Sequence, residues 1–163
     1  MVDTTGGAAG RRTERLELRV PTSRTQLPAV RAMTGDLAMR MDFDLDAVED
    51  LRLAVDEASA TLASVALPGT PLVAVFETGS TGLTITAWVA TTAGTDVPRD
   101  GFGWAVIAAL VDSVDAGPAD RGDVPGGEGG EGPVATITLV KELPPPLRTP
   151  AAGDSDADLS VAR

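Results

Sequence analysis

The sequence contains no cysteine, no histidine and no tyrosine among its 163 residues. The absence of cysteine excludes disulfide frameworks, thiolate nucleophiles and zinc sites built on thiolates. The absence of histidine removes the usual general base near neutral pH and any phosphohistidine chemistry. Any catalysis must therefore use carboxylates, hydroxyls and a bound metal or nucleotide.

Aromatic residues and positive charge are also scarce. Aromatics make up 3% of the chain, and 13 basic residues stand against 24 acidic ones, for a net charge of −11. Direct nucleic-acid binding is not expected, because base stacking needs aromatics and phosphate backbones repel negative charge. No run approaches the roughly 20 apolar residues that span a bilayer, and the amino terminus carries charges where a signal peptide needs an apolar core. We expect a cytoplasmic protein without a membrane segment.

Apolar residues make up 43% of the chain, which is enough for the core of one domain. Residues 1–13 are expected to be a disordered lead and residues 144–163 a disordered acidic tail. Residues 14–143 are expected to form the domain. Within it, residues 116–133 (AGPADRGDVPGGEGGEGP) have almost no apolar side chains, so we expect a mobile, acidic and glycine-rich loop there.

The first half of the domain predicts one strand and two helices. RLELRVP alternates apolar and polar residues, which is typical of a half-buried strand. QLPAVRAMTGDLAMRM places apolar residues at helical spacing, and Ser23 or Thr25 is available as its cap. Asp44 is the expected cap of a long second helix that ends before Leu67-Pro68-Gly69.

The second half predicts a hairpin, a helix and a last strand. PLVAVFET and LTITAWVA are joined by a short glycine-bearing connection, WAVIAALVDSV has helical character, and VATITLVKEL is rich in β-branched residues. The order strand, helix, helix, strand, strand, helix, strand predicts an α+β fold, a two-layer sandwich whose largely antiparallel sheet carries the helices on one face. Because the strands alternate, the other face is expected to meet water or a partner.

One flank of the long predicted helix is polar. A step of 100° per residue places Asp50, Ala54, Glu57, Thr61 and Ser64 on this flank. The apolar flank comprises Val48, Leu51, Val55, Ala58 and Leu62, and Leu45 and Val65 continue the apolar spacing at the two ends of the helix. A carboxylate and a hydroxyl one turn apart can serve a nucleophile beside a metal-bound phosphate. The alternative is an ordinary solvated helix face, since surface carboxylates are common.

Two glycines precede the last predicted helix. In DGFGWAVIAAL, Gly101 and Gly103 let backbone amides approach an anion at the positive end of the helix. The alternative is that they only turn the chain into the helix, because a lone G-x-G is a weak signal.

Taken together, these stretches resemble a known family. DLRLAVDEASATLASVA resembles the catalytic helix of the RsbW-like anti-sigma factors and serine kinases, a branch of the GHKL (histidine-kinase-like) ATPase superfamily. GFGWAVIAALVDSVD is similar to the second glycine box of that family. The resemblance runs from about Leu16 to Leu143 and implies the Bergerat-type sandwich of these ATPases.

The resemblance implies a role for individual residues. Glu57 matches the catalytic carboxylate, and Thr61 stands at the position of the magnesium-binding Asn. Thr61, Gly94, Gly101 and Gly103 would then bind the cofactors, ATP and Mg²⁺, with Thr61 as the metal ligand. The resemblance thus implies one nucleotide site shared by the long helix and the glycine boxes.

The chain departs from the family pattern at two places. A hydroxyl at Thr61 is a shorter and weaker oxygen ligand than an amide. In VATTAGTD, the first glycine box has Ala90, Thr91 and Thr92 where the family has an Asp that receives the adenine amino group. The loss of a specific acceptor weakens discrimination for adenine. The resemblance therefore implies a branch, like that of actinobacteria, with degenerate ATP-binding motifs and weak or absent kinase activity.

Three functions stay open at this point. The first is an anti-sigma factor, a homodimer that sequesters a stress or sporulation sigma factor until an anti-anti-sigma antagonist releases it. The second is an active serine kinase that phosphorylates this antagonist. The third is a scaffold without a sigma partner. The acidic charge of the chain suits the first, because complementary fields favour a basic partner.

Overall fold

The computed structural model describes residues 13–145. The lead expected over residues 1–13 and the tail expected over residues 144–163 lie almost entirely outside the described residues. Among the helices described, none combines the length and the apolar character that crossing a membrane requires.

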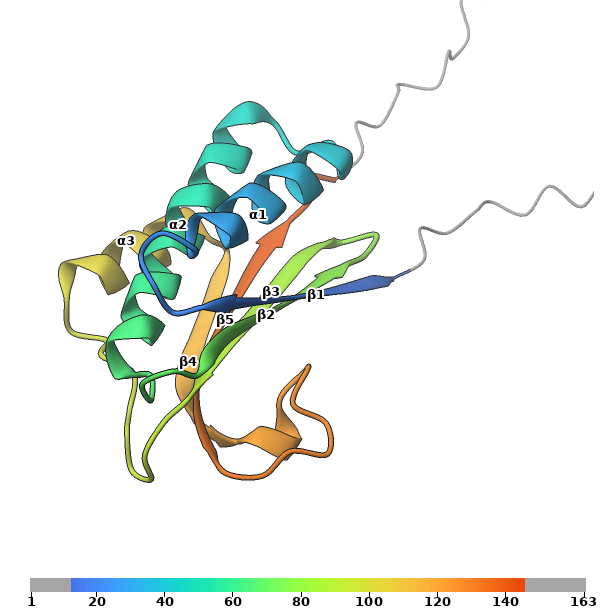
Figure 1. Cartoon of the computed structure of the whole chain (residues 1–163). Coiled ribbons are helices and arrows are strands. Elements are labelled where there is room, and N and C mark those ends of the chain that lie inside the picture. The colour runs from blue at the N-terminus through green and yellow to red at the C-terminus, as the bar shows by residue number, and fades with distance from the viewer. Residues whose placement is uncertain (1–12, 146–163) are drawn as a thin grey trace, which may run out of the picture.

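Five antiparallel strands form one sheet in the order β1-β2-β3-β5-β4. The strands are β1 (Glu14–Pro21), β2 (Pro71–Thr78), β3 (Gly82–Ala90), β4 (Ser113–Asp120) and β5 (Pro133–Glu142). The helices are α1 (Pro28–Arg40), α2 (Leu45–Val65) and α3 (Phe102–Leu110). All three helices lie on the same side of the sheet (Figure 1). The α+β class and the two-layer arrangement are thereby confirmed.

Local sequence signals explain how the two long helices begin. The Asp44 carboxylate accepts a hydrogen bond of 2.8 Å from the Ala47 N–H, so the predicted cap of α2 is confirmed. The cap predicted for α1 is wrong, because Leu27 occupies the N-cap position and no side chain caps it. The Ser23 carbonyl instead accepts the Leu27 N–H at 3.2 Å, which closes a turn before the helix.

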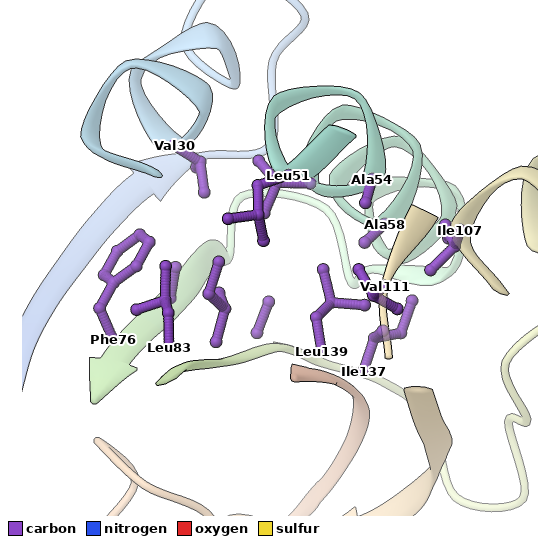
Figure 2. Packing of buried hydrophobic residues seen from close by; sticks show 14 of the residues in the cluster. Val30, Leu51, Ala54, Ala58, Phe76, Leu83, Ile107, Val111, Ile137 and Leu139 are labelled. Atoms are coloured by element: carbon purple, nitrogen blue, oxygen red, sulfur yellow. The ribbon is translucent and has the colours of Figure 1, made fainter. Parts of the chain in front are cut away.

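The main core lies between the helices and the sheet (Figure 2). Leu51 and Leu62 of α2 and Phe76 of β2 are fully buried in it. One assignment on α2 is wrong, because Ala54, which the helical step predicts on the polar flank, is fully buried. Leu45, at the first position of the apolar spacing, is 72% exposed. Ala54 is buried because α3 packs against that side of α2 and brings Ile107 into the same core.

Strand β4 is the main departure from the predicted order. The last predicted helix extends to Val114, but α3 ends at Leu110 and residues 113–120 pair with β5 along its length. The loop expected from residue 116 is therefore a strand over its first five residues. Alternation in SVDAGPAD is hard to recognise because Ala, Gly and Pro rarely favour strands. Pro118 is tolerated because β4 is an edge strand.

The remaining segment, residues 121–132, crosses the face of the sheet that the helices leave bare, and we call it the strap (Figure 1). Val124 of the strap packs into a second apolar cluster with Val73, Val75, Trp88 and Val134 of the sheet. The outer face was expected to meet water or a partner, and the chain itself covers part of it. The strap has few apolar residues, so its apolar contact with the sheet depends on Val124 and on the buried Trp88.

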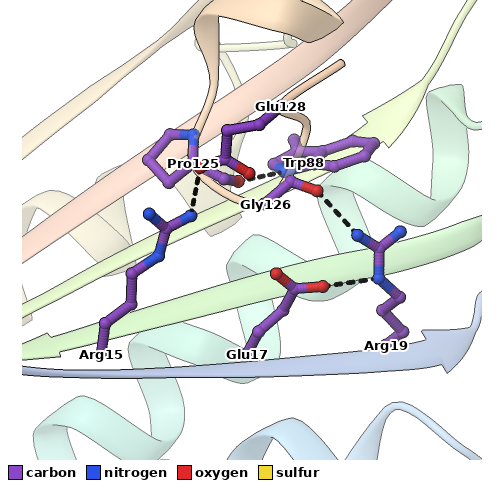
Figure 3. Close-up of polar contacts among 7 residues, drawn as sticks. All are labelled: Arg15, Glu17, Arg19, Trp88, Pro125, Gly126 and Glu128. Carbon is purple, nitrogen blue, oxygen red and sulfur yellow. Dashed lines mark hydrogen bonds and ion pairs between the residues drawn. The ribbon is translucent and has the colours of Figure 1, made fainter. Parts of the chain in front are cut away.

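Polar contacts attach the strap to the sheet (Figure 3). Trp88 Nε1 donates to the Pro125 carbonyl at 2.8 Å, and Arg19 Nη2 donates to the Gly126 carbonyl at 2.7 Å. Arg15 pairs with Glu128 at 2.6 Å, and this hydrogen bond, with backbone N–H groups, lowers the pKa of Glu128 to about 2. Since this ion pair is exposed, it contributes little to stability compared with the buried contacts of Trp88.

Candidate functional site

The polar flank of α2 faces the beginning of α3. Glu57 is half-buried, and a Cβ atom placed on Gly103 would lie 2.7 Å from Glu57 Oε2. The carboxylate therefore lies directly against the backbone of the first turn of α3. A larger residue at position 103 would displace this carboxylate. Glu57 and Gly103, which the sequence singled out separately, are brought together.

Gly101 forms the N-cap of α3 and has no side chain to satisfy the first N–H groups of the helix. A Cβ on Gly101 would meet no atom within 4 Å, so the approach to this helix end is open. The free N–H groups of a first turn carry partial positive charge. A half-buried carboxylate, Glu57, thus lies next to the positive end of a nine-residue helix.

The other two predicted site residues, Thr61 and Gly94, lie on α2 and in the connection between β3 and α3. Thr61 is half-buried one turn after Glu57, and its carbonyl accepts a hydrogen bond of 2.6 Å from Ser64 Oγ within α2. Gly94 lies in the connection between β3 and α3, with a φ of +80° that favours glycine and open space around it. In the same connection, the Thr92 and Thr95 hydroxyls lie 2.9 Å apart.

Two buried hydroxyl groups, those of Thr91 and Ser59, have no hydrogen-bond partner among the described residues. Thr91, directly after β3, is 2% exposed, and its N–H donates to the Pro133 carbonyl at 3.0 Å while its Oγ1 has no partner. Ser59, on α2, is also 2% exposed with an unpaired Oγ. A buried hydroxyl left unpaired costs about 1–3 kcal/mol. In the sequence, Thr91 is notable only because it lies where the resembled family has an Asp, and Ser59 carries no signal.

Comparison with known proteins identifies relatives of the chain. No family model matches it. Two curated proteins do match, each named Anti-sigma-F factor RsbW, from the CDC 1551 / Oshkosh and ATCC 25618 / H37Rv strains of Mycobacterium tuberculosis. Each is 35% identical over 99 residues, which cover 61% of this chain and 59% of the relative. The chain is thus similar to RsbW proteins over this stretch.

These two matches confirm the resemblance to RsbW-like proteins that the long helix and the second glycine box indicate. The match spans less than two thirds of the length of these relatives. Membership of the wider GHKL superfamily stays a prediction.

The donor set of this RsbW-like chain does not form a self-contained metal site. Within residues 13–145, no group of three or more Asp, Glu, His or Cys side chains could hold a metal ion. The polar flank offers two carboxylates, Asp50 and Glu57, which lie two turns apart, and the hydroxyls of Thr61 and Ser64. Mg²⁺ is usually held by one or two carboxylates together with substrate phosphates. The residues present therefore do not fit a magnesium ion held without a nucleotide.

A groove of the RsbW-like chain lies beside this flank rather than over Glu57. It has a volume of about 550 Å³ and runs between the start of α1 and the second half of α2. Its only carboxylate is Asp56, whose pKa is raised by burial, an effect that Arg31 at 3.3 Å partly offsets. Arg24 also lines the groove. The groove thus presents one positively and one negatively charged side chain.

Proposed function

We propose that this RsbW-like chain is an anti-sigma factor. It binds an alternative sigma factor of the stress or sporulation type, and an anti-anti-sigma antagonist releases that sigma factor. The observation that carries this proposal is the 35% identity to two proteins named Anti-sigma-F factor RsbW. Since the match covers 59% of these relatives, their partner is carried over as part of the proposal.

The charge of the chain supports a protein partner. A net charge of −11 disfavours nucleic acid and favours a partner with a basic surface. Complementary charge also increases the association rate at low salt. We further propose that the chain acts as a homodimer in the cytoplasm.

We also propose that sigma binding does not depend on a nucleotide. Thr61 provides a hydroxyl where the resemblance calls for an amide, and Thr92 stands in the box that should carry an adenine-binding carboxylate. Both changes remove specific contacts of ATP and Mg²⁺ and leave the packing of α2 against the sheet intact. Any kinase activity is therefore weak or absent in this proposal.

Mixing the purified chain with each sigma factor of its own genome should give one stable complex. Its dissociation constant, measured by calorimetry, is expected to change less than about threefold when ATP and Mg²⁺ are added, because the nucleotide contacts are degenerate. Adding the antagonist should then release the sigma factor. If no sigma factor of that genome is retained, the proposal is lost.

The second candidate function is an active serine kinase acting on the antagonist. The observation in its favour is the contact of the Glu57 carboxylate with Gly103 at the start of α3, where a phosphate would meet free N–H groups. In this alternative, Glu57 is the base and Thr61 the metal ligand.

The kinase alternative predicts magnesium-dependent transfer of phosphate to a serine of the antagonist. Glu57→Gln should reduce that rate by about 10²–10⁴-fold, the usual contribution of a general base. Glu49→Gln is the matched control, because Glu49 lies on the same helix and only pairs with Arg52 at 2.7 Å. Calorimetry that detects no ATP binding in the presence of Mg²⁺ would rule the kinase out.

A further inference from the structure

Helix α3 has the composition of a buried helix but is not buried. Its sequence, FGWAVIAAL, contains no charged or hydrogen-bonding side chain except the Trp104 indole. A helix that is apolar on all sides normally lies inside a protein. Yet Ile107 is the only buried residue of α3 in the described chain. The outer side of α3 therefore lacks a covering layer.

The exposed residues of α3 share one side of the helix. They are Phe102, Ala105, Ala108 and Ala109, which we call the α3 face. Phe102 and Ala109 are seven positions apart and Ala105 lies between them, so the three line up along two turns. Phe102 is 86% exposed, the highest value among the large apolar residues described. Exposed apolar patches of this kind commonly mark interaction sites.

Negative charge borders both ends of the α3 face. Asp100 lies two positions before the first residue of α3 and Asp112 two positions after its last, and both are exposed. In the described part of the chain, no ion pair involves either residue. Arg99 pairs with Asp96 at 3.8 Å, and Lys141 turns its ammonium group towards the Leu110 carbonyl at 2.9 Å. The border is therefore net acidic.

We propose that the α3 face is the docking surface for an apolar segment of the sigma factor that is flanked by lysine or arginine. This inference rests on the proposed function and adds the surface that performs it. The apolar residues of the partner cover Phe102 and Ala105, and its basic residues meet Asp100 and Asp112. The apolar centre provides most of the affinity and the acidic border provides orientation and a faster encounter.

Charge argues against a second copy of this chain as the occupant. When two α3 faces pack antiparallel, Asp100 of one copy approaches Asp112 of the other, and both are carboxylates. Like charges at an interface oppose association.

Two variants with matched controls test the docking surface. Ala105→Arg places bulk and a repelling charge on the α3 face, and Phe102→Ala removes its aromatic ring. The controls are Ala32→Arg and Met39→Ala, which make the same kinds of change at exposed positions of α1. Affinity for the sigma factor that the wild-type chain retains is measured by calorimetry at low and high salt. Circular dichroism checks that each variant folds, and light scattering gives its mass.

Both α3 variants are expected to weaken sigma binding at least about tenfold, as truncation of a central interface residue does. The α1 controls should bind like the wild type, and the wild-type affinity should fall as salt rises. Wild-type affinity in both α3 variants overturns the docking surface and leaves the proposed function standing. The docking surface is also overturned if the α1 controls weaken sigma binding as much as the α3 variants do. The same holds if the α3 variants convert an oligomer to a monomer. A wild-type chain that binds no sigma factor overturns both proposals.

Discussion

Replacing Trp88 by alanine is expected to lower the free energy of unfolding by about 3–5 kcal/mol. Trp88 is 2% exposed and fills the cluster that Val73, Val75 and Val124 form between the sheet and the strap. The substitution leaves a cavity there and also removes the hydrogen bond to the Pro125 carbonyl. Urea unfolding followed by circular dichroism measures the loss, and amide hydrogen exchange in residues 121–132 should become faster.

Trp88→Phe is the matched control for this prediction. It keeps an apolar ring in the cluster but leaves the Pro125 carbonyl without its donor, so an intermediate loss of about 1–3 kcal/mol is expected. A loss below about 1 kcal/mol for the alanine variant would show that the strap is not held by Trp88.

Leu51→Ala is expected to destabilise the chain by about 2–5 kcal/mol, the range for a leucine deleted from a packed core. Leu51 is fully buried in the first half of α2 and belongs to the main core between the helices and the sheet. Leu53 lies two positions further along the same helix and is 47% exposed. Leu53→Ala deletes the same atoms from a partly exposed position and should change stability by no more than about 1 kcal/mol. Equal losses in urea unfolding would contradict the assigned orientation of α2.

Much of the fold follows from local signals in the sequence. The alternation in RLELRVP, the cap at Asp44 and the short connection between PLVAVFET and LTITAWVA predict β1, α2 and the β2–β3 hairpin, and the structure contains all of them. These signals work because each depends on the residues of one element. Strand β4 escaped prediction because its pairing with β5 outweighs the weak strand preference of Ala116, Gly117 and Pro118.

The strap could not be predicted for a different reason. Its glycines and acids are typical of an unpacked loop, and its attachment depends on Trp88, which lies more than thirty positions earlier in the chain. The burial of Ala54 likewise depends on how α3 packs against α2. Periodicity describes one element at a time and contains no information about such contacts.

The candidate site was predictable residue by residue but not as an arrangement. Glu57 came from the polar flank of a helix and Gly103 from a glycine pair, and the resemblance assigned both to one site. Their direct contact became visible only in the structure, because it depends on the packing of α3 on α2. The unpaired hydroxyls of Ser59 and Thr91 have no sequence signal, since an isolated Ser or Thr is compatible with many environments.

The two layers of the molecule contain one indole each. Trp88 lies under the strap on the outer side of the sheet, and Trp104 of α3 packs against the main core on the helical side. With no tyrosine and only these two tryptophans in the sequence, nearly all of the ultraviolet fluorescence originates from them. Emission from Trp104 therefore reports on the helical layer, while emission from Trp88 reports on the opposite side of the sheet. The chain carries an intrinsic optical label for each of its faces.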